Sequence, residues 1–389
     1  MSASAAMSRR YGNLVAAIAT IASCDIAMGL TFQLLPLLME ARGVPAWVMG
    51  LNAAMSPLAI LLAGPFLPAV IARFGSKTVV NTVIAVIIAA LLSFKIFPGL
   101  AAWFVIRFIF GIAAGTLFTV SEAWILSFAE TGNRGRVMAL YASVLSVTFA
   151  VGPIVIPLTG IDGWMPWLIG MVCVGLSALP LSFVEVSEAS FRDDKGGSFL
   201  RFVARAPLLL FAVGSATIFD GILLSFFAVF GLRSGLDLQT VSWVLAAGIL
   251  GNVLLQYPMG MLADRWSRTG VIAATAAITV VLCLAMIWTI NSWLIWPVVI
   301  VAGSTAFAVY TISLTILGDS FEGPDLIAGS AAFSAMWGVG GLVGPPIAGA
   351  AIDAFGVNAM PVTLALSYVV LLIGLAWSGG RLVRSAAHG

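Results

Sequence analysis

Long apolar runs follow one another almost from end to end of this chain, and only short polar turns separate them. A helix needs about 20 apolar residues to cross the ~30 Å hydrocarbon core of a bilayer. Within lipid the backbone polar groups must be paired inside the segment, so continuous apolar runs favour spanning helices. We therefore predict twelve membrane-spanning helices, over residues 12–38, 45–71, 78–97, 99–128, 136–159, 163–184, 206–231, 238–263, 270–290, 292–317, 327–353 and 358–378.

Few charges interrupt these runs, and their distribution predicts an orientation. Charged residues make up 9% of the chain and hydrophobic residues 61%, with a mean hydropathy of +1.12, which excludes a soluble globular protein. With the N-terminus in the cytoplasm, 14 of the 18 basic residues fall in inner segments, and Arg42, Lys95 and Arg233 in outer ones. This positive-inside bias predicts a multi-pass protein of the inner (cytoplasmic) membrane with both termini in the cytoplasm. The net charge of +2 is not gathered in one patch, so we expect no nucleic-acid partner.

One polar stretch divides the twelve spans six and six. We predict an N-terminal six-helix bundle over residues 1–184, a cytoplasmic linker over 185–205 and a C-terminal six-helix bundle over 206–389. The halves also match each other at a shift of 192 residues, which places Gly43 on Gly235 and Arg73 on Arg265. The expected fold is therefore an all-α integral membrane protein of two pseudo-symmetric bundles.

Three charged residues lie deep inside predicted spans, many residues from either end. Arg107 lies near the middle of its helix, where a charge costs about 2.5–3.5 kcal/mol on insertion scales, so such residues usually face a bundle interior or a water-filled path. Asp25 and Asp220 lie in the first and seventh helices, one helical turn apart once the shift of 192 is applied. A carboxylate that is protonated facing one side and ionised facing the other can carry a proton. A structural ion pair with no coupling role is the alternative.

The residue inventory argues against an enzyme. The only histidine, His388, lies in the C-terminal tail, and no Ser or Cys has a credible base nearby in sequence. The three cysteines fall in apolar spans at no metal-like spacing. We therefore expect no catalytic residues, no metal and no cofactor, and the remaining chemistry is proton binding and ligand orientation.

Three motifs carry a resemblance to a known family. Gly260-Met-Leu-Ala-Asp264-Arg265-Trp-Ser-Arg268 ends the eighth span, Arg73-Phe-Gly-Ser-Lys77 follows the second, and Arg107-Phe-Ile-Phe-Gly-Ile-Ala-Ala-Gly115 lies in the fourth. Together with twelve spans in two halves, they resemble the major facilitator superfamily (MFS) over the whole chain, in its proton-coupled drug and metabolite transporter type. Ser121-Glu122-Ala-Trp124 and Asn133-Arg-Gly-Arg136 suggest the YcaD-like branch.

The chain departs from the family pattern at several positions. Ser267 replaces the usual glycine of the loop motif, and Pro68 and Ala72 occupy the expected glycine and aspartate positions of its first copy. The fifth helix has Gly152-Pro153 but lacks the two further glycines of drug/proton antiporters. A fuller glycine run lies in the eleventh helix, where close packing and a hinge are both open interpretations. These departures leave the direction of transport open.

The resemblance implies a site. In the family fold the first, fourth and seventh helices line a central cavity, so Asp25, Arg107 and Asp220 could meet there, with the two aspartates as proton-coupling candidates. Further candidates for the cavity, or for hydrogen bonds between helices, are Gln33, Asn52, Phe118, Phe219, Phe226, Asn252, Gln256, Tyr257 and Tyr310. The gating and loop-motif candidates are Arg73, Lys77, Glu122, Gly260, Asp264, Arg265 and Arg268. Among these, Glu122 is expected to pair with a basic loop residue such as Arg73 or Arg136.

These observations predict a secondary active transporter that moves a small organic solute by alternating access. We expect coupling to protons, with efflux by antiport slightly favoured over uptake by symport, and a monomer in contact with membrane lipid. A lipid or lysolipid flippase on the same fold, and a membrane sensor that no longer transports, are the alternatives.

Overall fold

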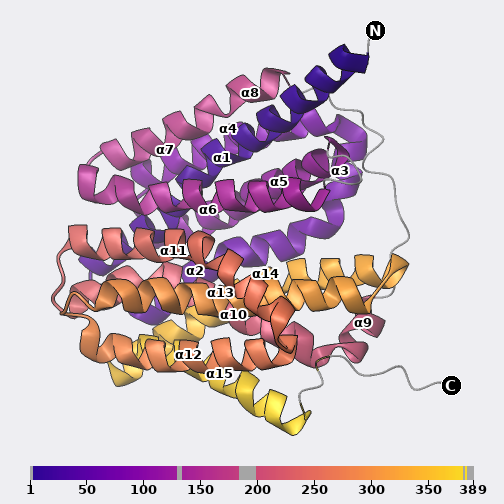
Figure 1. The fold of residues 1–389 in the computed structure, drawn as a ribbon. Helices are drawn as coiled ribbons and strands as arrows, with labels where there is room; N and C mark the ends of the chain where they lie inside the picture. Colours follow the sequence, from indigo (N-terminus) through magenta and orange to yellow (C-terminus); the bar gives the residue numbers. More distant parts are fainter. Residues whose placement is uncertain (1–2, 129–133, 184–198, 380–381, 383–389) are drawn as a thin grey trace. The chain divides into compact units, whose positions relative to one another are not determined.

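The computed structural model describes residues 3–128, 134–183, 199–379 and 382, and all the regular structure in these ranges is helical. In chain order the elements are α1 (Ala3–Ala41), α2 (Ala46–Ala63), the 3-10 turn η1 (Gly64–Phe66), α3 (Leu67–Phe74), α4 (Ser76–Ile96), α5 (Leu100–Phe128), α6 (Arg134–Thr159), α7 (Met165–Leu176), α8 (Ala178–Phe183), α9 (Phe199–Arg205), α10 (Pro207–Arg233), α11 (Leu238–Arg265), α12 (Arg268–Thr289), α13 (Ile295–Ser320), α14 (Gly323–Phe355) and α15 (Ala359–Trp377) (Figure 1).

The twelve predicted spans are each represented by helix. Eleven stretches of the described chain are long and apolar enough to cross a membrane. The predicted sixth span corresponds to a shorter apolar stretch, Met165–Leu181, which contains α7 and the start of α8. The helix is interrupted at Ser177, whose hydroxyl donates to the carbonyl of Val174 at 2.6 Å. The fold class predicted from the hydropathy pattern is thus confirmed.

Two details of the helices differ from the prediction. The second span is not one continuous helix, because Gly64 and Pro65 form η1 between α2 and α3. Proline has no N–H to donate and interrupts the hydrogen-bond ladder. The last residues of the predicted linker form α9, where the Phe202 ring packs against Phe321 at 5.0 Å and Arg205 forms an ion pair with Asp325.

Contacts divide the chain into two compact units, and the division does not follow a single point in the sequence. The first unit contains Met1–Leu35 and Leu58–Asp193, and the second contains Pro36–Pro57 and Asp194–Gly389. The last turn of α1 and the first part of α2 therefore belong with the C-terminal helices. Both helical crossings between the units fall at a proline inside a helix, Pro36 in α1 and Pro57 in α2. The bundle boundaries at 184 and 206 remain a prediction.

The first unit is packed around α1, α4, α5, α6 and α7. An aromatic stack joins α4, α5 and α7, with the Phe94 ring 5.7 Å from Trp167 and 6.2 Å from Trp103. The indole N–H of Trp103 donates to the Phe94 carbonyl at 3.1 Å, so this ring buries its one polar atom with a partner.

The second unit is built around α10, which packs against α11, α13, α14 and α15. Phe219 of α10 meets Tyr368 of α15 edge to face at 6.0 Å, and the Tyr368 hydroxyl donates to the Ala306 carbonyl of α13 at 2.9 Å. The Thr217 hydroxyl lies 2.9 Å from the Met336 carbonyl and ties α10 to α14. Small hydroxyl side chains of this kind commonly join helices in membranes.

Candidate functional site

Among the described residues of the first unit, Asp25 is the charged group with the least exposed side chain. It lies just past the middle of α1 and is 2% exposed. The Thr148 hydroxyl of α6 lies 3.1 Å from Asp25 Oδ2. The same hydroxyl lies 2.9 Å from the Val144 carbonyl and 3.1 Å from the Leu145 carbonyl, so its single proton has alternative acceptors.

Two glycines bring α1 and α6 close enough for this contact. A Cβ added at Gly29 would overlap the backbone of Phe149, and one added at Gly152 would overlap the backbone of Leu30. Only glycine allows the two helix backbones to approach this closely. Gly152, which belongs to the incomplete antiporter signature of the fifth span, therefore has a packing role beside Asp25.

Arg107 of α5 reaches the same pair of helices. It is 3% exposed, and its guanidinium lies over the Phe32 ring of α1 at 5.4 Å from the centroid. Phe32 in turn contacts Phe149 of α6 at 5.7 Å. The aromatic face offers the cation a favourable electrostatic contact. Asp25 and Arg107, both found from the sequence, thus share the α1–α5–α6 region of the first unit.

Two polar residues of this region were missed by the sequence reasoning. Besides Thr148, the Tyr141 ring is 2% exposed and its hydroxyl has no hydrogen-bond partner within the described residues. Tyr141 lies within electrostatic reach of Asp25 and of Glu122 on α5. Tyr141 and Thr148 are seven residues apart, which places them on one face of α6. That spacing of polar residues in an apolar span is the one signal of them that the sequence offers, and it is not specific.

The remaining candidates of the first unit are distributed along its helices. Phe118 is half-buried in α5, and Gln33 is buried in α1. Glu122 is exposed at the far end of α5, and Arg73 lies over the neighbouring Phe74 ring at 5.3 Å. The side chain of Arg136, the other partner predicted for Glu122, lies outside the described residues.

In the second unit Asp220 is half-buried in α10, next to the buried Phe219. Phe226 is also fully buried, and Asn52 is buried in α2. Tyr310 of α13 belongs to an aromatic cluster, with Phe307 at 5.3 Å, Trp337 at 6.1 Å and Phe333 at 6.4 Å. Gln256 is half-buried in α11. The side chains of Asn252 and Tyr257 lie outside the described residues.

The loop motif after α11 has a clear local structure. Arg265 is exposed at the end of α11, and Arg268 forms an ion pair with Asp319 of α13. Ser267 has φ −67° and caps α12 by accepting from the Gly270 N–H at 3.0 Å. This cap explains the departure from glycine at that position. Gly260 and the Asp264 side chain lie outside the described residues.

The first copy of the loop motif, after α3, uses a different local structure. The equivalent position under the shift of 192 is Gly75, whose φ of 79° favours glycine. Arg73 is exposed at the end of α3, and Lys77 is half-buried at the start of α4. The equivalent position is therefore a glycine with positive φ in the first copy and a serine that caps the following helix in the second.

Comparison with known proteins agrees with this architecture. The MFS-type transporter YfkF of Bacillus subtilis is 26% identical over 378 residues, covering 93% of this chain and 95% of that protein. The MFS-type transporter YcaD of Salmonella typhimurium is 23% identical over 375 residues, with 93% and 95% coverage.

Solved structures show the same fold. A crystal structure of a mutant nucleoside transporter NupG matches with a TM-score of 0.75 at 14% identity, covering 94% of this chain and 99% of that one. A bacterial homologue of the human lysosomal transporter Spinster, solved inward-facing and unoccupied, matches with a TM-score of 0.77 at 14% identity, with 97% and 99% coverage.

Apolar spanning helices with charged groups buried among them are typical of multi-pass membrane transporters. The family model of the Major Facilitator Superfamily matches residues 16–239 and 209–385. The chain belongs to the major facilitator superfamily, in its YcaD-like branch. It is therefore a secondary transporter of a solute.

Proposed function

We propose that this transporter moves a small organic solute out of the cell in exchange for protons, and that Asp25 is the principal proton carrier. The observation that supports this proposal is a carboxyl group, 2% exposed, that faces a hydroxyl with alternative acceptors. Burial of an ionised carboxylate is costly unless hydrogen bonds or a cation offset it. Such a group gains or loses its proton when its surroundings change.

The Asp25–Thr148 contact suits both protonation states. When Asp25 is ionised, the Thr148 O–H donates to Oδ2 across the 3.1 Å contact. When Asp25 is protonated, its own O–H donates to the Thr148 oxygen, and the Thr148 O–H turns to the Val144 carbonyl at 2.9 Å. A hydroxyl both donates and accepts, so one side chain satisfies both forms of the acid.

Arg107 and Asp220 complete the proposed pathway. We propose that Arg107 holds a polar group of the solute and balances the ionised form of Asp25, since both lie in the α1–α5–α6 region. Asp220 is the substitute proton site on α10. The Phe32 ring beside Arg107 favours a solute with apolar surface.

Vesicle transport tests the proposal. A ligand-stability screen on the purified protein would first supply a solute that raises its melting temperature. Uptake of that solute into inside-out vesicles should then rise when the vesicle interior is made acidic and collapse when a protonophore removes the gradient. Equal uptake with and without the gradient would exclude proton coupling. Movement of fluorescent lipid in place of the solute would favour the flippase.

A further inference from the structure

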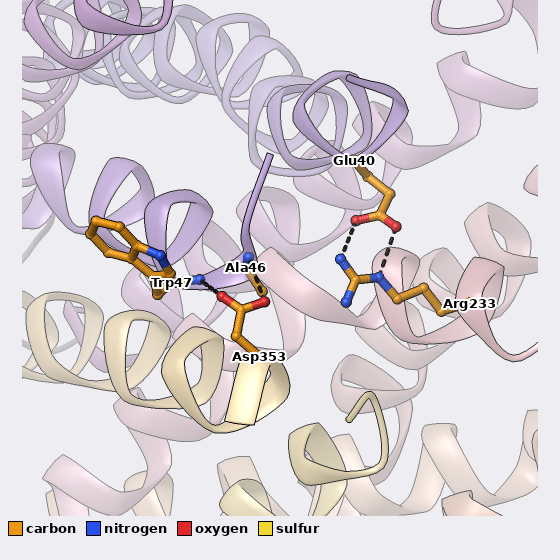
Figure 2. Close-up of polar contacts among 5 residues, drawn as sticks. All are labelled: Glu40, Ala46, Trp47, Arg233 and Asp353. Carbon is orange, nitrogen blue, oxygen red and sulfur yellow. Dashed lines mark hydrogen bonds and ion pairs between the residues drawn. The ribbon is translucent and has the colours of Figure 1, made fainter. Parts of the chain in front are cut away.

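The tip of the α1–α2 hairpin is held by a contact that its own sequence does not provide. Helix α2 begins at Ala46 after Val44 and Pro45, neither of which has a side chain that can cap a helix. The first N–H groups of a helix have no acceptor within it. Asp353, near the end of α14, accepts from the Ala46 N–H at 3.0 Å and from the Trp47 N–H at 2.8 Å (Figure 2).

The equivalent helix of the other half carries its own cap. The turns before α2 and α11 match under the shift of 192: the Gly43 N–H donates to the Glu40 carbonyl and the Gly235 N–H to the Leu232 carbonyl. Both glycines have positive φ, 67° and 98°. The position equivalent to Pro45 is therefore Asp237, which caps α11 through the Thr240 N–H at 2.8 Å.

That local cap on α11 is complete without a second helix. The hydrogen bonds from Thr240 hold the pKa of the Asp237 carboxyl below its usual range, so it stays ionised. Helix α2 has a proline at this position and takes its carboxylate from α14 instead. The cap of α11 is thus a contact within one segment, whereas the cap of α2 joins two segments that are distant in the sequence.

An ion pair lies beside this cap. The Nε and Nη2 atoms of Arg233, the last residue of α10, donate to the two carboxylate oxygens of Glu40 at 2.8 and 2.7 Å (Figure 2). Arg233 also lies within electrostatic reach of Asp353. One guanidinium thus faces two carboxylates, one near the end of α1 and one near the end of α14. A fork of this shape is the stronger form of a salt bridge.

Next to these polar contacts, the backbones of α2 and α14 are in direct contact. A Cβ at Gly50 of α2 would overlap the backbone of Pro345 in α14, and a Cβ at Gly349 of α14 would overlap the backbone of Ala46. Such a close contact is either made or fully broken, because packed interfaces do not deform continuously. The polar contacts at the tip therefore shift the balance between a closed arrangement, in which α2 packs on α14, and an open one.

We propose that Glu40, Arg233 and Asp353 form an outer latch that holds the hairpin tip on α10 and α14, and that its release opens the solute pathway to the side away from the cytoplasm. This inference rests on the alternating access of the proposed function and on the predicted orientation. Pro36 and Pro57, at the two helical crossings between the units, interrupt the hydrogen-bond ladders of α1 and α2, so we expect the tip to bend there.

The latch is weak enough to be reversible. The side chains of Arg233 and Glu40 are 32% and 21% exposed, so water and salt reach the pair. Each contact of this kind is expected to change the ratio of closed to open molecules by roughly twofold to fivefold. A transport cycle needs this range, since a much stronger latch would trap one state.

Spin-label distances test the latch. With Cys24, Cys173 and Cys283 replaced, labels at Val44→Cys and Asn358→Cys report the distance between the hairpin turn and the end of α14. We expect Glu40→Gln and Asp353→Asn each to raise a longer-distance population twofold to fivefold. Asp237→Asn is the matched control, since it neutralises a helix-capping carboxylate at the same end that does not join two segments, and it should leave the distribution unchanged.

A charge exchange separates the latch from general destabilisation. Glu40→Arg and Arg233→Glu should each open the tip, while the double variant should restore the closed distribution because the pair is re-formed. Distributions for Glu40→Gln and Asp353→Asn that match the Asp237→Asn control would overturn the latch. That result would not touch the proposed function, which the vesicle assay tests without labels at the tip.

Discussion

At the scale of single residues, the two groups that matter most in the first unit are a carboxyl and the hydroxyl that faces it. Asp25 is costly to bury as an ion, and the Thr148 hydroxyl, 3.1 Å from its Oδ2, offsets part of this cost. Thr148 also has the Val144 carbonyl as an alternative acceptor. In the proposed proton cycle, this hydroxyl therefore affects how easily Asp25 loses its proton.

Removing that hydroxyl should move the pH dependence of transport. Thr148→Val keeps the shape but withdraws a donor from the ionised form of Asp25 and an acceptor from its protonated form, and the bond to the charged form is the stronger of the two. The protonated form is then favoured, so the pH of half-maximal gradient-driven transport should rise by roughly half to one unit. A pH profile of vesicle uptake measures this shift, and Thr148→Ser should retain the parent profile.

Thr159 supplies the matched control for this prediction. It lies on the same helix, and its hydroxyl bonds the carbonyls of Val155 and Gly160 rather than Asp25. Thr159→Val should therefore leave the pH profile in place. An equal shift in both variants would show that the effect comes from α6 as a whole and not from Asp25.

At the scale of helices, hydropathy located the spans because lipid leaves a helix few alternatives to continuous apolar sequence. The same pattern was silent on η1 and on the break at Ser177, which depend on local backbone bonding. It also missed α9, which lies in a polar stretch and is stabilised by Phe202 on Phe321.

The candidate site was predictable only in part, for a physical reason. A charge inside an apolar span is rare, so Asp25, Arg107 and Asp220 could be found from sequence alone. Thr148 and Tyr141 could not be selected, because many hydroxyls in spans bond their own helix. The contact with Asp25 becomes visible only when α1 and α6 are placed side by side.

The packing of α1 on α6 gives a prediction about stability. A Cβ at position 152 would overlap the backbone of Leu30, so Gly152→Ala should force the helices apart. We expect a loss of roughly 1–3 kcal/mol in stability, seen as a lower melting temperature in detergent. Gly175→Ala in α7 is the control, since no atom lies within 4 Å of a Cβ there. Equal melting temperatures for the two variants would contradict the close contact.

At the scale of the whole molecule, the two compact units do not coincide with the two six-span halves predicted from the sequence. The hairpin tip between Pro36 and Pro57 packs with the C-terminal helices. Sequence alone could not show this, because a helix carries no mark of the partner that it will pack against. The contacts of Glu40 and Asp353 hold this tip in place, because they join the ends of α1 and α2 to α10 and α14.

The predicted orientation can be tested with impermeant thiol reagents in intact cells. In a background without native cysteines, Val44→Cys should react from outside, because the turn after α1 is predicted to be outer. Lys195→Cys, in the predicted linker and outside the described residues, should react only after the cells are opened. Labelling of Lys195→Cys in intact cells would reverse the topology and place the latch on the cytoplasmic side.

The most direct test of the account is transport by Asp25→Asn in sealed vesicles, with and without a pH gradient. A neutral side chain carries no proton but still permits the two units to move. Accumulation driven by the gradient should therefore be lost, while exchange of labelled for unlabelled solute at equal pH continues. If Asp25→Asn accumulates solute as the parent does, Asp25 is not the proton carrier. Loss in Asp220→Asn instead would then move that role to α10.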